Sequence, residues 1–291
     1  MGLANIAAEQ IIKELTQKMV QQPRLKEVAA KCEKSLEFGG KDYLEALSNM
    51  NRYFLQNCWS DGFPLVAPTE EAVNEMIEGT EFPREHIVGF VEPGHGKATV
   101  EKIAINAVMA GCLPQYMPVI IAAVEAITDK MFYLSGVQCT TGNVSPLLIL
   151  SGQKLINELN INYSFSTLGP GWRANSTIGR AIRLMMINLG HAWPGNPDMK
   201  PFGSPFKYVM LIAENEDACS DTWEPLRVTE GFAHDESTIS VMPAVSWQPD
   251  ATDVAHDPAT VKTVIEITTK QAKIKYDKHA ENWGRHNLLL I

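Results

Sequence analysis

Residues 87–110 read IVGFVEPGHGKATVEKIAINAVMA and contain both patterns on which the fold class depends. A short apolar run comes first and is typical of a buried strand. A loop rich in glycine follows, and apolar residues then recur at helical spacing. Short apolar runs and helical patterns continue to alternate along the chain. We therefore expect an α/β fold in which a layered mixed sheet is flanked by helices.

The same reading gives an expected order of elements. Residues 1–57 form an N-terminal helical region of three helices, and residues 58–291 form an α/β domain that binds the ligand. Thr69 is expected to cap a helix. Further helices are expected at 98–110, 114–128, 175–189 and 259–273, and strands at 87–91, 146–150, 164–168, 207–213 and 237–242. The apolar residues 288–291 are expected to form a docked strand, in this chain or against a partner.

Composition narrows the class of protein. The chain has 291 residues, 45% of them hydrophobic, and a net charge of −9. An acidic chain is a poor match for nucleic acid or an anionic membrane, which attract basic surfaces. The apolar run 117–124 is too short to cross a bilayer, and residues 1–8 do not resemble a signal peptide. Five cysteines without a Cys-x-x-Cys pair indicate reduced thiols and a cytoplasmic protein.

Two loops that contain Pro-Gly are the best candidates for a binding site. Each is expected to lie between a strand and a helix, so the segments 88–102 and 165–180 would be two copies of one unit facing a shared site. Glycine admits a ligand close to the main chain, a helix start offers N–H donors, and a nearby cation adds charge. The predicted anion-binding residues are Gly94, Gly96, Lys97, Gly171, Trp172, Arg173 and Asn175. Capped helix starts with solvated cations are the alternative.

Cys112 is the candidate nucleophile. It follows Gly111, a natural helix end, and precedes Pro114, a natural helix start, so it is expected beside a helix N-terminus that lowers a thiol pKa. A buried small side chain at a helix corner is the alternative. His95 and Glu101 are candidate proton-transfer groups. A hydrogen-bonded surface histidine is the alternative for His95, and a surface charge pair with Lys102 is the alternative for Glu101. Thr140 and Thr141 are candidate ligand hydrogen bonders. No histidine pair has metal-ligand spacing, and the loops match no nucleotide motif, so the cofactor is unknown.

Five segments together resemble the UGSC-motif (seleno)protein family. They are DGFPLVAPT at 61–69, TVEKIAINAVMAGC at 99–112, GPGWRANSTIGRA at 169–181, AENE at 213–216 and WEPL at 223–226. The resemblance covers about residues 55–291 and implies thiol or selenol redox chemistry. This sequence departs from the family because it contains no Cys-Gly-Ser-Cys segment. The resemblance then implies an oligomer in which a partner subunit supplies the missing pieces.

Three functions follow from these patterns. The first is an enzyme that cleaves or reduces a carbon–heteroatom bond in a small carboxylate or phosphate substrate, with Cys112 as the thiol. The second is a hydro-lyase or isomerase that uses His95 or Glu101 and no thiol. The third is a ligand-binding or scaffolding subunit of a redox complex.

Overall fold

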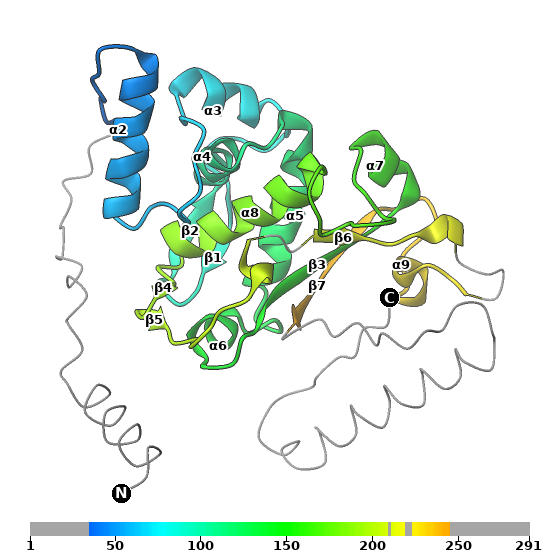
Figure 1. Ribbon diagram of the computed structural model, residues 1–291. Coiled ribbons are helices and arrows are strands. Elements are labelled where there is room, and N and C mark those ends of the chain that lie inside the picture. Colours follow the sequence, from blue (N-terminus) through cyan, green and yellow to red (C-terminus); the bar gives the residue numbers. More distant parts are fainter. Residues whose placement is uncertain (1–34, 209–210, 219–222, 245–291) are drawn as a thin grey trace, which may run out of the picture. The chain divides into compact units, whose positions relative to one another are not determined.

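The computed structural model describes residues 35–208, 211–218 and 223–244 (Figure 1). The chain divides into two compact units, Met1–Tyr53 and Phe54–Ile291, whereas the sequence predicts a boundary between 57 and 58. Helix α2 (Tyr43–Gln56) begins in the first unit, after a non-helical stretch, and its Asn49 side chain donates to the carbonyl of Gly39 at 2.8 Å. The predicted helices before residue 35, the helix at 259–273 and the apolar end lie outside the described residues.

The second unit contains the α/β fold that the sequence predicts. Its helices are α3 (Glu70–Ile77), α4 (Val100–Ala110), α5 (Met117–Thr128), α6 (Leu134–Cys139), α7 (Gln153–Glu158), α8 (Arg173–Asn188) and α9 (Leu226–Thr229), with 3-10 turns η1 (Pro114–Tyr116), η2 (Pro205–Lys207) and η3 (Glu216–Ala218). Its strands are β1 (Ile87–Val91), β2 (Gly96–Thr99), β3 (Ser145–Ser151), β4 (Trp193–Pro194), β5 (Pro197–Asp198), β6 (Leu211–Ala213) and β7 (Thr238–Ala244).

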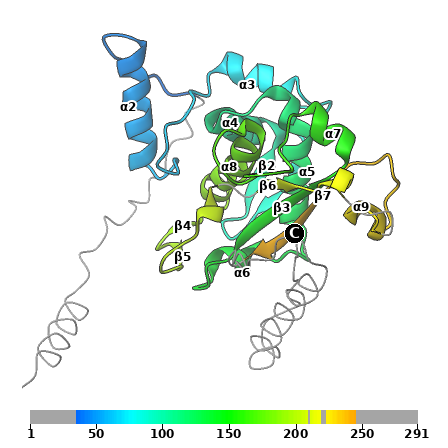
Figure 2. The ribbon, with the colours of Figure 1, turned by 45° about the vertical axis from the view of Figure 1, so that its right-hand side comes forward.

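The central sheet is mixed and has the order β6-β3-β7. Strand β3 pairs in parallel with β6 and antiparallel with β7, and all seven of its residues are buried. Helices α5 and α8 pack on one face, while Leu226 of α9 and Leu168 pack on the other (Figures 1 and 2). A strand covered on both faces needs apolar side chains in both directions, and this explains the unbroken run Leu147–Leu150.

The packing of helix α5 explains why its sequence is apolar on nearly every side. It packs against β7 of the sheet and also against β1, which forms a separate antiparallel hairpin with β2. Seven of its residues are therefore buried. A helix between two layers has little solvated surface, so the segment that resembles a short membrane span is instead a core helix. Within the described ranges, no helix is both long and apolar enough to cross a bilayer.

Local signals set the helix ends, and at Thr69, Gly111 and Pro114 they do so as the sequence predicts. Thr69 caps α3 by accepting from the Ala72 amide, and Thr99 caps α4 by accepting from the Lys102 amide. Gly111 ends α4 in the left-handed conformation, with φ of 86°, a backbone angle that glycine adopts readily. Pro114 then begins the turn that leads into α5. These caps define a tight corner around Cys112.

Two predictions, one strand and the repeated unit, are wrong, and the strand expected at 207–213 is described only over Leu211–Ala213, with Lys207 in a 3-10 turn. Residues 164–168 form turns, because Asn162 directs main-chain and side-chain bonds to Ser164, Phe165 and Thr167 instead of leaving them for a sheet. The segment 88–102 has the order strand, turn, strand, helix, since β2 precedes α4. The two Pro-Gly segments therefore do not share one strand–loop–helix unit, and no duplication is visible in their secondary structure.

Candidate functional site

The start of α8 is the candidate site, and its first turn lacks a cap. The capping position is Trp172, which makes no side-chain capping hydrogen bond. The first amide with a main-chain acceptor is that of Ser176, which donates to the Trp172 carbonyl at 3.1 Å. The preceding amides of residues 173–175 have no acceptor among the described residues, and a helix start of this kind favours negative charge.

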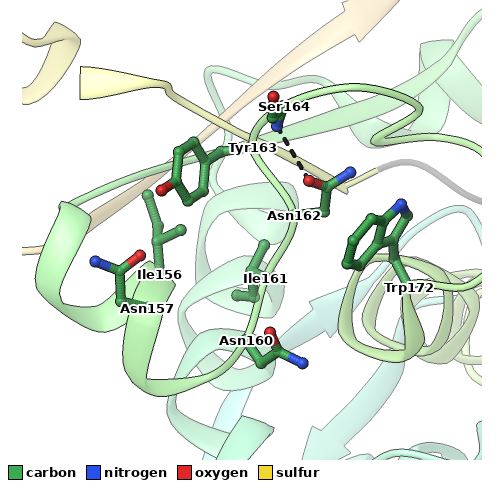
Figure 3. A pocket seen from close by; sticks show the side chains of 8 residues that line it. All are labelled: Ile156, Asn157, Asn160, Ile161, Asn162, Tyr163, Ser164 and Trp172. Atoms are coloured by element: carbon green, nitrogen blue, oxygen red, sulfur yellow. Dashed lines mark hydrogen bonds between the residues drawn. The ribbon is translucent and has the colours of Figure 1, made fainter. Parts of the chain in front are cut away.

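Trp172 also forms one wall of a pocket of about 410 Å³ (Figure 3). Figure 3 shows its ring facing the pocket from the start of α8, with Tyr163 and the residues of α7 across from it. The remaining lining is neutral and comes from α7 and the loop after it, namely Ile156, Asn157, Asn160, Ile161, Asn162, Tyr163 and Ser164. Amides, hydroxyls and one indole ring suit a small polar ligand that has a flat face.

Arg173 connects this pocket wall to the corner after α4. Its Nε donates to the carbonyl of Gly111 at 3.1 Å, and the side chain is exposed. In the part of the chain that the structure describes, the two terminal amino groups of this guanidinium have no acceptor. Gly171, exposed and with φ of 103°, leads into the helix beside it. The predicted residues Gly171, Trp172 and Arg173 thus lie together at an exposed, positively charged helix start.

Cys112 lies in the predicted corner before Pro114 and also beside Arg173, but its thiol is not activated. The side chain is 6% exposed and its Sγ donates to the carbonyl of Thr177 at 3.3 Å. Burial raises the pKa of Cys112 to about 12, although the Thr177 bond and the charges of Arg173 and Arg180 act to lower it. The expected depression of the pKa is therefore wrong, because desolvation of the thiolate outweighs the nearby positive charge.

Asn175 has a structural position. It is fully buried, and its amide oxygen accepts from the Asn162 main-chain N–H at 2.9 Å. Its amide nitrogen donates to the Asn162 carbonyl at 2.9 Å and to Thr167 Oγ1 at 3.1 Å. These bonds fasten the loop 162–167 to α8. The prediction that Asn175 holds a carboxylate with Arg173 is wrong, because its hydrogen-bonding groups are already used inside the protein.

The other Pro-Gly loop lies at the opposite end of α8. The amide of Gly94 donates to the Gly190 carbonyl at 2.8 Å, and that of Gly96 donates to the Leu189 carbonyl at 3.1 Å. These acceptors follow the last residue of a 16-residue helix, which spans about 24 Å. The predicted convergence of the two loops on one site is therefore wrong. The main chain of the first loop is occupied by α8 itself and not by an anion.

The other candidate residues are likewise separate from the α8 start. His95 is exposed on the hairpin turn and pairs with Glu92 at 2.7 Å, and Lys97 is exposed on β2. Glu101, in the first turn of α4, pairs with Arg84, whereas Cys112 follows the last turn. The predicted catalytic set of Cys112, His95 and Glu101 is thus not brought together.

Thr140 and Thr141 lie between α6 and the start of β3, while α7 and the pocket follow its end. Strand β3, whose seven residues span about 23 Å, lies between these threonines and the pocket residues. Thr140 Oγ1 accepts from the Gly142 amide at 3.0 Å, a local turn bond. These threonines do not belong to the Trp172 pocket.

Comparison with known proteins adds no relative. No family model matches the chain, and no curated protein or solved structure was found to be similar to it. The resemblance to the UGSC-motif family stays a prediction. In residues 35–208, 211–218 and 223–244, no three His, Cys, Asp or Glu side chains gather as a metal site would need.

Sequence reasoning missed two groups of residues near the start and middle of α8. Asp61 accepts a turn bond from the Phe63 amide, at 3.2 Å, and it also accepts two bonds from Arg180 at 2.7 and 2.8 Å. Its side chain is 1% exposed. The pocket residues 156–164 were also missed, and the run of asparagines at 157, 160 and 162 is the only signal in the sequence that could have indicated them.

Proposed function

We propose that the chain binds a small ligand with a carboxylate group at the start of α8. The observation that carries the proposal is that three features lie side by side at this helix start. They are the uncapped amides, the Trp172 pocket wall, and the Arg173 guanidinium, which has no acidic partner among the described residues. A guanidinium presents paired donors that match a planar carboxylate. The neutral pocket then receives the body of the ligand, with a flat part against the indole ring.

This proposal favours the ligand-binding reading over the two enzymatic ones. Thiol chemistry at neutral pH requires a thiolate, and the pKa of Cys112 is raised to about 12. The general-base reading requires His95 or Glu101 near the ligand, and both pair with other residues away from the α8 start. The enzymatic readings, the redox complex and the partner subunit stay predictions from the sequence.

A ligand screen with matched variants tests the proposal. Small carboxylic acids, each beside its uncharged amide, are titrated into the full-length protein while melting temperature and heat of binding are measured. We expect at least one acid to bind and its amide not to. Arg173→Met should weaken binding by at least tenfold, and Trp172→Ala should weaken it for ligands with a planar body. Exposed Lys154→Met is the control. A carboxylate that binds Arg173→Met as tightly as the native protein contradicts the proposal.

A further inference from the structure

Four charged side chains, from α8, the end of β5, the residue pair after it and η2, gather away from the Trp172 pocket. Asp198, at the end of β5, pairs with Lys207 and lies 3.4 Å from the Nζ of Lys200. Arg183 of α8 donates from Nε to the Lys207 carbonyl at 2.7 Å. We refer to Arg183, Asp198, Lys200 and Lys207 as the basic cluster. It contains three cations and one carboxylate.

The basic cluster is well shielded from water. Side-chain exposure is 2% for Lys200, 4% for Asp198 and 15% for Lys207, and Arg183 is 7% exposed as a residue. Lys200 is held in place because its Nζ also donates to the carbonyls of Val137 and Gln138, at 2.9 and 3.1 Å, near the end of α6. Helix α6 lies beside β5 in both views (Figures 1 and 2).

The nearby acidic groups do not balance this charge. Besides Asp198, the carboxylate that acts on Arg183 is that of Asp61. Asp61 is paired through both oxygens with Arg180, so its negative charge neutralises that guanidinium and not Arg183. The basic cluster therefore keeps an excess of two positive charges. Burial lowers the pKa of Arg183 to about 10 despite Asp198, which is a sign that the cation lacks full compensation.

Buried charge without a counter-charge is unfavourable, so a bound anion would stabilise this cluster. The terminal amino groups of Arg183 make no hydrogen bond within the described residues, although its Nε does. Among the described arginines, the Nε of Arg227 is the one nitrogen that is fully enclosed and has no partner. The unpartnered amino groups of Arg183 are therefore not fully enclosed and keep some contact with solvent. Donors that are held rigidly, charged and still reachable are what a bound anion requires.

We propose that the basic cluster binds a phosphate group carrying two negative charges, through Arg183 and Lys207 with Lys200 behind them. A phosphate monoester or inorganic phosphate carries close to two charges near neutral pH, and this matches the excess. Arginine supplies a paired fork of donors and lysine a compact charge, a combination well suited to phosphoryl oxygens.

The test uses inorganic phosphate with the full-length protein at constant ionic strength, with chloride as the balancing anion. We expect phosphate to raise the melting temperature above that in chloride alone, and titration heats to fit one site. Lys207→Met should weaken phosphate binding by at least tenfold. Asp198→Asn removes a negative charge but keeps an oxygen acceptor, and it should tighten binding severalfold. These two variants change the charge in opposite directions, so a shared folding defect cannot produce both results.

Two controls separate this site from the proposed carboxylate site. Lys154→Met removes an exposed cation elsewhere and should leave phosphate binding unchanged. Arg173→Met should also leave phosphate binding unchanged, while weakening binding of the carboxylate ligand by at least tenfold. The proposal is overturned if phosphate acts no more strongly than chloride, if Lys207→Met binds phosphate normally, or if Arg173→Met is the variant that loses phosphate. Phenyl phosphate in the same titration shows whether the site also accepts a phosphate monoester. Binding of inorganic phosphate without binding of phenyl phosphate still supports the site.

Discussion

The thiol of Cys112 donates a hydrogen bond to the carbonyl oxygen of Thr177, 65 residues later in the chain and one turn into α8. This bond joins the corner after α4 to the helix that carries Arg173. It consumes the hydrogen of the only described cysteine that is buried. The thiol therefore has a structural role at the position where the sequence predicts a nucleophile.

The first prediction concerns the reactivity of this thiol. With its pKa near 12, Cys112 should react with iodoacetamide at neutral pH far more slowly than Cys139, which is half-buried. Peptide mass spectrometry of the native protein at timed intervals measures both rates. Rapid labelling of Cys112 that a carboxylate ligand blocks would restore the thiol enzyme as the leading function.

The second prediction concerns alkaline stability. Between the ordinary pKa of a thiol, about 9, and the raised value of about 12, the unfolded chain loses the Cys112 proton while the folded protein keeps it. The free energy of unfolding should therefore fall as pH rises through this range, by up to about 1.4 kcal/mol per pH unit from this group. Urea unfolding at pH 8 and 10 should show a smaller loss in Cys112→Ala. An equal loss in both proteins would mean that other groups dominate.

The third prediction concerns the buried pair of Asp61 and Arg180. Asp61→Ala leaves an 85% buried guanidinium without its carboxylate, so we expect a loss of about 3 kcal/mol in the free energy of unfolding. Glu158→Gln, which breaks the exposed pair with Lys154, is the matched control and should cost less than about 0.5 kcal/mol. Comparable losses for the two variants would argue against a special role for the buried pair.

The fourth prediction separates stability from binding at the two asparagines near Trp172. Asn175→Ala removes a buried amide with several bonds, so it should destabilise the protein by about 2 kcal/mol or more. Asn157 lies in the pocket lining, so Asn157→Ala should leave the melting temperature unchanged while weakening ligand binding. A stable Asn175→Ala with weakened binding would reinstate Asn175 as a ligand residue.

The fifth prediction tests the contact between the hairpin turn and α8. A Cβ on Gly96 would lie 2.3 Å from the main-chain oxygen of Leu189, so Gly96→Ala should destabilise the second unit strongly, by about 2 kcal/mol or more. Gly142→Ala is the control, because its Cβ would meet only the Thr140 hydroxyl, at an ordinary 3.5 Å. Denaturant midpoints of the two variants should differ clearly, and equal midpoints would disprove the close contact.

The sequence predicts the local structure well where the signal is itself local. Thr69 through its side chain, and Gly111 and Pro114 through their backbone, each set a helix boundary, and α/β is the observed fold class. The prediction of a strand at 164–168 is wrong, because hydrogen bonds between Asn162 and Asn175, thirteen residues apart, fasten this loop to α8. Such a contact leaves no periodic pattern in the chain.

The candidate site was predictable only in part, and for the same reason. Gly171, Trp172 and Arg173 are adjacent in sequence, so their grouping required no tertiary information. Whether this group meets the other Pro-Gly loop depends on the length and direction of α8, and the basic cluster depends on how β5 and η2 pack on it. Charges that come together from distant segments, such as Asp61 with Arg180, cannot be paired from one sequence.

The hairpin turn at Gly94 and Gly96 has a wider consequence for how such loops are interpreted. Small residues in a loop indicate that some atom approaches the main chain closely, but they do not identify that atom. Here it belongs to the chain's own helix, which ends against the turn and takes the place a ligand would occupy. Variation at these positions across related chains would then track the residues at 189–191, and not the chemistry of any bound molecule.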